Sequence, residues 1–69
     1  SNMVIRMYKK LIYLKMEQKS ALDEIQNEIL ANGGSVSIMR LMQDSIQIFI
    51  QHYSEEAIER YSPCYDKKT

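Results

Sequence analysis

Lys-Lys-Leu-Ile-Tyr-Leu-Lys-Met, residues 9–16, is the stretch of this sequence that decides the fold. Side chains of an extended chain point alternately to opposite faces. One face here carries Ile12, Leu14 and Met16, and the other carries Leu11, Tyr13 and Lys15. β-branched and aromatic residues stand in the middle of the run, which favours a strand. The alternation predicts one N-terminal β-strand in a chain whose remainder indicates helix.

A single strand needs hydrogen-bonding partners for its backbone, and an exposed strand edge invites pairing with another chain. The chain has 69 residues, and a domain of about 60 residues buries only about 60% of its unfolded surface. Its one cysteine, Cys64, and one histidine, His52, exclude an internal disulfide and a structural metal cluster. Oligomerisation remains as the means of stabilisation. We therefore expect a homodimer in which two copies of the strand form an antiparallel ribbon.

A first helix is predicted after the strand. Ser20 would be its N-cap, or the helix would begin at Glu17 or Gln18 with acids near its positive end. Its apolar positions are Leu22, Ile25, Ile29 and Leu30. The helix should end at Asn-Gly-Gly, residues 32–34, because these residues tolerate the left-handed conformation that closes a helix.

A second helix should begin at once, with Ser35 or Ser37 as N-cap and Ser35 favoured because it directly follows the glycines. Its apolar stripe comprises Ile38, Leu41, Met42, Ile46, Phe49, Ile50 and Tyr53. Ile48 lies outside this stripe. Ser54 followed by two glutamates indicates a further short helix, which Pro63 ends.

The chain therefore divides into three parts. Residues 1–7 are interpreted as a tag remnant, Ser1-Asn2, followed by a flexible basic arm. Residues 8–53 form the folded domain, and residues 54–69 form the short C-terminal helix and a disordered tail.

Charge is segregated along the chain although the net charge is zero. Residues 1–20 carry five basic and one acidic side chain, and residues 21–69 carry four basic and eight acidic ones. A dimer would gather two basic segments in one place. The sequence shows no apolar run of membrane-spanning length and no signal peptide, so a cytoplasmic location is expected. No catalytic constellation is present, and neither an enzyme nor a cofactor or metal is expected.

Two runs resemble a known family: Lys-Leu-Ile-Tyr-Leu-Lys-Met at residues 10–16, and Asn-Gly-Gly-Ser-Val-Ser-Ile-Met-Arg-Leu-Met-Gln-Asp-Ser-Ile at residues 32–46. In their order and spacing they resemble the ribbon-helix-helix superfamily of transcriptional repressors, which includes the Arc and methionine repressors. The likeness covers residues 8–53. It implies an intertwined homodimer with a two-stranded ribbon in the major groove of double-stranded DNA and a four-helix core, and two dimers side by side on DNA.

The resemblance also implies roles for individual residues. The base-reading positions would be Leu11, Tyr13 and Lys15. Leu11 departs from the family, which usually has a polar or charged residue there, and packing beneath the arm or against a neighbouring chain is the alternative for it. Phosphate contacts would come from Gly34, Ser35, Val36 and Ser37 at the second helix and from Arg6, Lys9 and Lys10 in the arm. The dimer core would comprise Ile12, Leu14, Met16, Leu22, Ile25, Ile29, Ile38, Leu41, Met42, Ile46 and Phe49.

Two other functions fit the sequence. One is an antitoxin or adaptor that grips a toxin or other protein partner through residues 54–69. The other is a helical dimerisation module without a nucleic-acid role, which the zero net charge favours slightly. Loss of DNA binding with rising salt would distinguish a DNA-binding protein from the second alternative.

Overall fold

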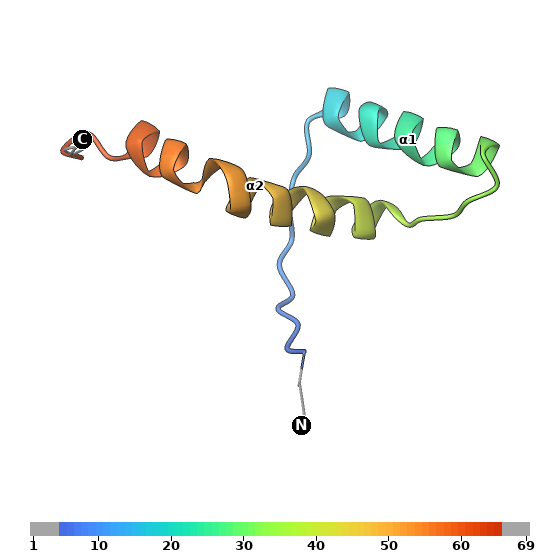
Figure 1. Ribbon diagram of the computed structural model, residues 1–69, viewed down its shortest axis with the longest axis horizontal. Coiled ribbons are helices and arrows are strands. Elements are labelled where there is room, and N and C mark those ends of the chain that lie inside the picture. The colour runs from blue at the N-terminus through green and yellow to red at the C-terminus, as the bar shows by residue number, and fades with distance from the viewer. Residues whose placement is uncertain (1–4, 66–69) are drawn as a thin grey trace.

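The computed structural model describes residues 5–65 and consists there of two helices (Figure 1). Helix α1 spans Met16–Ala31 and helix α2 spans Ile38–Tyr61. The helices form an antiparallel hairpin in which α1 lies beside the first half of α2. Residues 5–15 leave the start of α1, cross α2 and project away from the hairpin (Figure 1).

The predicted N-terminal β-strand is wrong, because residues 5–65 contain no strand. Residues 5–15 form neither helix nor strand, and the two-stranded ribbon that the family resemblance implied is absent with them. The alternation of side chains indicates an outstretched backbone, but a strand also needs a neighbouring segment to accept its hydrogen bonds. Nothing in the described part of the chain supplies that neighbour. Met16, expected to close the strand, is the first residue of α1.

Helix α1 begins earlier than either predicted start. Lys15 is the N-cap, with extended backbone angles of φ −68° and ψ 149°. Its N–H donates to the side-chain oxygen of Gln18 at 2.9 Å, which is half of a capping box. Ser20 therefore lies inside the helix. Lys19 and Asp23, one turn apart, form an ion pair at 2.8 Å on the surface of α1.

The turn at residues 32–34 ends α1 as the sequence predicts. Gly33 has a φ of +84°, in the region that favours glycine. The Gly34 N–H then donates to the Ile29 carbonyl at 2.9 Å. Beyond the turn, the Gln26 side chain donates to the Val36 carbonyl at 2.8 Å and fastens the linker to α1. The turn and this bond set how the two helices lie together.

The N-cap of helix α2 is Ser37 and not the favoured Ser35, because the Ser37 hydroxyl accepts the Arg40 N–H at 3.0 Å. The helix continues without a break to Tyr61, so residues 54–61 extend α2 and do not form a separate helix. Inside the helix, the Ser54 hydroxyl donates to the Ile50 carbonyl, so Ser54 is not a cap. The predictions for the tag remnant and for residues 66–69 lie outside the described residues.

A single chain has no closed core. No residue between 5 and 65 is fully buried. The accessible surface is 6994 Å², whereas a folded protein of 8.1 kDa exposes about 4,500 Å². The radius of gyration is 16.5 Å, compared with about 11 Å for a compact chain of this length. The apolar faces of both helices consequently remain open to solvent.

Candidate nucleic-acid interface

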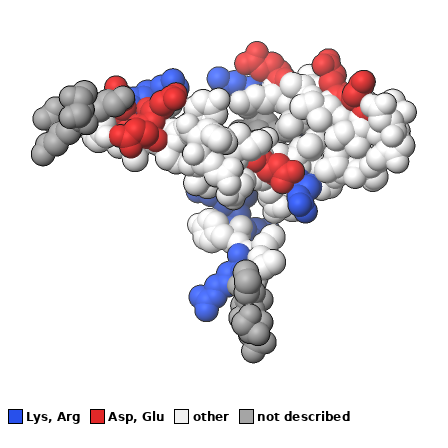
Figure 2. Space-filling model, in the orientation of Figure 1, with Lys and Arg blue, Asp and Glu red and all other residues white. Residues whose placement is uncertain are grey.

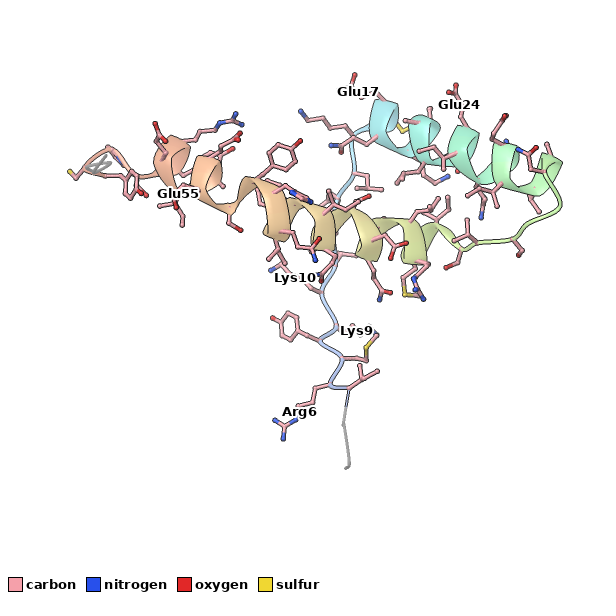
Figure 3. All side chains as sticks on the ribbon, in the orientation of Figure 1. Arg6, Lys9, Lys10, Glu17, Glu24 and Glu55 are labelled. Atoms are coloured by element: carbon pink, nitrogen blue, oxygen red, sulfur yellow. The ribbon has the colours of Figure 1, made fainter. Side chains whose placement is uncertain are left out.

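The segment that projects from the helical hairpin is cationic. Residues 5–15 contain Arg6, Lys9, Lys10 and Lys15 and no acidic side chain. All of these four side chains are exposed. Figure 3 shows Arg6, Lys9 and Lys10 spaced along the segment on one side of α2. Such a row of cations on an outstretched backbone is suited to follow a line of phosphates.

Acidic side chains are placed elsewhere on the molecule. Glu17 and Glu24 lie on the side of α1 that faces away from the basic segment (Figure 3), and Glu55 lies in the far half of α2. In the space-filling view acidic side chains lie along the helices, where some basic side chains accompany them, whereas the projecting segment shows basic side chains and no acidic ones (Figure 2). Although its net charge is zero, the molecule therefore has one strongly basic projection, residues 5–15.

The three predicted base-reading residues are exposed in the structure. Tyr13 is 88% and Leu11 76% exposed, and Lys15 is also exposed. Their neighbours are less so: Ile12 is 49% exposed and Leu14 is half-buried. These exposures differ in the sense that the alternation predicts, but Met16, which was predicted to share a face with Ile12 and Leu14, is 79% exposed. Leu11, Tyr13 and Lys15 are free to contact another molecule.

The segment also lies beside the first turns of α2. A shallow hollow there is lined by residues from both sides: Tyr8, Lys9, Lys10, Leu11, Ile12, Met39, Met42, Gln43 and Ile46. Two predicted phosphate-binding lysines are in this group. Met39, which is 63% exposed, was not predicted as a site residue, although its position in the first turn of the second helix could have indicated it.

The predicted phosphate site at the start of α2 is only partly open. Ser35 is exposed, whereas Val36 is half-buried and its carbonyl is occupied by Gln26. The Ser37 hydroxyl is occupied as the N-cap. Gly34 makes its close approach to Ile29 and not to an open surface. The backbone N–H groups of the first turn remain the feature of this helix end that suits an anion.

The predicted core residues fall into two groups. Six of them are half-buried, namely Leu14, Leu22, Ile29, Ile38, Leu41 and Met42. The remaining five are exposed, namely Ile12, Met16, Ile25, Ile46 and Phe49. Met16 is 79% exposed, so its expected place against the helices is not seen in the single chain.

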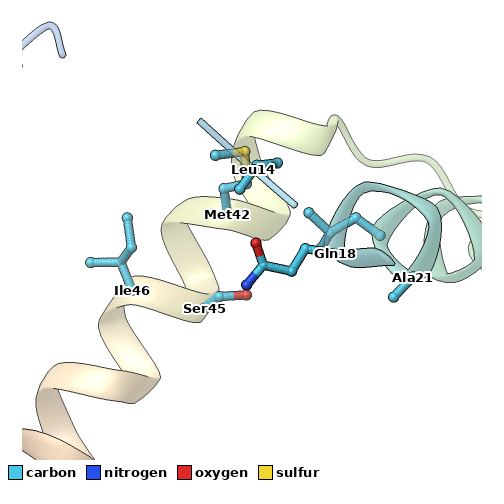
Figure 4. A pocket seen from close by; sticks show the side chains of 7 residues that line it. Leu14, Gln18, Ala21, Met42, Ser45 and Ile46 are labelled. Atoms are coloured by element: carbon cyan, nitrogen blue, oxygen red, sulfur yellow. The ribbon is translucent and has the colours of Figure 1, made fainter. Parts of the chain in front are cut away.

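An apolar hollow of about 330 Å³ lies where the two helices diverge (Figure 4). Its lining is Leu14, Gln18, Ala21, Leu22, Met42, Ser45 and Ile46. Four of these were predicted as core, whereas Gln18, Ala21 and Ser45 were not predicted as site residues. Ala21 and Ser45 are small, and the spacing of Ser45 within the apolar stripe of the second helix is the signal that could have placed it there.

Residues 5–65 hold no group of three or more metal-ligating side chains. Neither helix in this part of the chain combines the length and the apolar character that crossing a membrane requires. Arg40, which the sequence did not assign to DNA, forms an ion pair with Asp44 at 3.2 Å.

No family model, curated protein or solved structure matches this chain.

Proposed function

We propose that the protein is a sequence-specific DNA-binding repressor that acts as a homodimer through the basic segment at residues 5–15. The observation that carries the proposal is the separation of charge. Four exposed cations, with no acid among them, project from a hairpin whose helices carry the acidic side chains. A polyanion binds such a projection and is repelled by the other surfaces.

The surface of a single chain supports the homodimer. It exceeds the surface of a compact protein of the same mass by roughly 2,500 Å². Two chains together carry about twice that excess, and obligate homodimer interfaces bury about 2,000–5,000 Å² in total. The hollow bordered by Leu14, Leu22 and Ile46 is apolar and would be filled by the partner. A dimer carries two basic segments and so doubles the four cations.

The proposed contacts differ in kind along the segment. Arg6, Lys9 and Lys10 contact phosphates and position the protein without reading sequence. Lys15 donates to base edges such as guanine O6 and N7, and Tyr13 offers both a hydroxyl group and an apolar ring. Leu11 is limited to apolar contacts such as that with a thymine methyl group. The predicted two-stranded ribbon has no part in this proposal.

The test is selection of bound sequences from a random pool of duplex DNA, followed by binding measurements on the selected duplex at two salt concentrations. We expect one enriched sequence and a steep loss of affinity with salt, since each phosphate contact contributes about −0.9 to the slope of log K against log salt. Absence of binding at low salt would refute the function. Binding without enrichment would refute the sequence specificity.

A further inference from the structure

The second half of α2 carries an apolar row that its own chain leaves uncovered. We define the C-terminal stripe as Ile50, Tyr53, Ala57 and Tyr61, whose spacing of three or four residues places them on one side of the helix. Ile50 is 55%, Tyr53 48% and Tyr61 76% exposed, and Ala57 is half-buried. Helix α1 lies beside the other half of α2 and does not extend over this stripe (Figure 1).

Residues 62–65, which follow α2, also leave this stripe open. Beyond α2, the Tyr65 N–H donates to the Ser62 carbonyl at 2.9 Å, and the Tyr65 hydroxyl donates to the Glu55 carboxylate. Glu55 is two positions before Ala57, about 200° around the helix. The returning chain is therefore fastened to the opposite side of α2, and the C-terminal stripe remains available to another molecule.

We propose that the C-terminal stripe binds the same stripe of a second copy, with the two helices antiparallel, and that this contact joins two dimers into a tetramer. The contact is separate from the apolar hollow between α1 and α2 and requires neither DNA nor the basic segment. The proposal goes beyond DNA binding because it assigns a second self-association surface to the chain.

The charges beside the C-terminal stripe favour a second copy of this chain as its binding partner. Glu56 and Arg60 lie on the same edge, one turn apart, and together with Phe49, Tyr53, Ala57 and Tyr61 they line one hollow. In an antiparallel pair with its two-fold axis near residues 57 and 58, Glu56 of each copy faces Arg60 of the other. Among the described residues, ion pairs join Lys19 to Asp23 and Arg40 to Asp44, and Glu56 and Arg60 belong to neither.

The sizes of the side chains fit the same arrangement. Ala57 is small and lies between Tyr53 and Tyr61, each one turn away. An antiparallel copy places Ala57 opposite Ala57, where two backbones can approach closely, and places Tyr53 opposite Tyr61. The rings then cover the alanines from both ends. In a parallel copy the edge that carries Glu56 and Arg60 would instead face the opposite edge of the partner's stripe, so Glu56 would not meet Arg60.

The test is a charge reversal on the full chain, with mass measured by light scattering and sedimentation equilibrium over a wide range of protein concentration and without DNA. We expect the wild type to form a tetramer. Glu56→Arg and Arg60→Glu should each weaken tetramer formation roughly tenfold or more, because two symmetric attractions become repulsions. The double variant Glu56→Arg/Arg60→Glu restores both attractions and should again be a tetramer.

Glu24→Arg is the matched control, since it changes the net charge as Glu56→Arg does but lies on the exposed side of α1 away from the stripe. It should leave the tetramer intact. Circular dichroism confirms that each variant keeps its helices. A wild type no larger than a dimer, single reversals that remain tetrameric, or a double variant that stays dissociated would each overturn the proposal. So would finding that the stripe binds an unrelated protein in place of a second copy.

Discussion

Gly34 lies against Ile29 so closely that a Cβ added to Gly34 would stand 2.9 Å from Cγ2 of Ile29 and 3.3 Å from its carbonyl oxygen. The neighbouring Gly33 is different. A Cβ there would meet nothing within 4 Å, but its φ of +84° is one that other residues adopt with strain. The two glycines of the turn are thus required for separate reasons, one steric contact and one backbone angle.

Gly34→Ala should lower the free energy of unfolding by about 1–3 kcal/mol, because Ile29 or the turn must move. Gly33→Ala should lower it by about 1–2 kcal/mol through backbone strain alone, and Gly33→Asn should recover much of that loss. Urea denaturation at one fixed protein concentration measures all three changes. A Gly34→Ala variant as stable as the wild type would show that the close approach to Ile29 is not maintained in solution.

Ser37→Ala should lower the free energy of unfolding by about 1 kcal/mol, since it removes the acceptor for the Arg40 N–H at the start of α2. Ser35→Ala is the matched control, being the same substitution two residues earlier on an exposed residue. It should change stability by less than about 0.5 kcal/mol. Thermal and urea unfolding of the two variants measure these changes. Equal losses of stability in Ser37→Ala and Ser35→Ala would contradict Ser37 as the N-cap.

The N-cap of α2, Ser37 and not Ser35, shows how far local sequence predicts the ends of the helices. The glycines indicate where α1 ends, because their effect is confined to their own backbone. They do not indicate how many linker residues the chain needs before α2 can begin. That number depends on the bond from Gln26 to the Val36 carbonyl, which joins residues ten positions apart. Ser37 becomes the cap because Val36 is still held by α1.

The error at residues 9–16 has a different cause. Alternation predicted which side chains lie on each face, and the exposures of Tyr13 and Leu14 follow that prediction whereas the exposure of Met16 does not. A strand, however, forms only by backbone hydrogen bonding to a second segment. The alternation within one segment does not show that a second one is present. The start of α1 was missed because Gln18 caps the helix through its side chain, in the absence of the usual Ser, Thr, Asp or Asn at the N-cap.

Ile46→Asn tests the proposed dimer. Ile46 is 49% exposed in the single chain and borders the apolar hollow, whereas Ile48 is 53% exposed and lies on the other side of α2. If a partner covers Ile46, the substitution should cost about 2–4 kcal/mol of dimer stability, and Ile48→Asn should cost much less. Dissociation constants from sedimentation equilibrium give both values. Equal effects of the two substitutions would indicate that no partner covers the hollow.

Tyr65 should titrate above its ordinary range. The hydrogen bond to Glu55 raises the pKa of Tyr65 above its usual value of about 10, with burial and the charges of Glu55 and Glu59 acting in the same direction. The protonated hydroxyl is the form that this contact favours. Its contribution to stability is therefore present below pH 10 and is lost as the pH rises through the raised pKa.

Ultraviolet titration of the phenol, taken as the difference between the wild type and Tyr65→Phe, measures this pKa. Glu55→Gln should lower it toward the ordinary value, because the neutral amide removes the acceptor charge. Ser54→Ala, a neighbouring change without effect on charge, should leave it in place. An unshifted Tyr65 in the wild type would show that the returning chain is not fastened to Glu55.

Substitutions in the basic segment should separate base reading from phosphate binding. Lys15→Ala should weaken binding to the selected duplex by about 1–3 kcal/mol and affect unrelated duplexes less. Lys9→Ala should weaken binding to every duplex and reduce the salt slope by about 2 per dimer, since each copy loses one phosphate contact. Lys19→Ala is the control, because Lys19 is paired with Asp23 on α1. Fluorescence anisotropy over a salt series measures all three. If Lys15→Ala and Lys19→Ala bind the selected duplex equally well, Lys15 does not read bases.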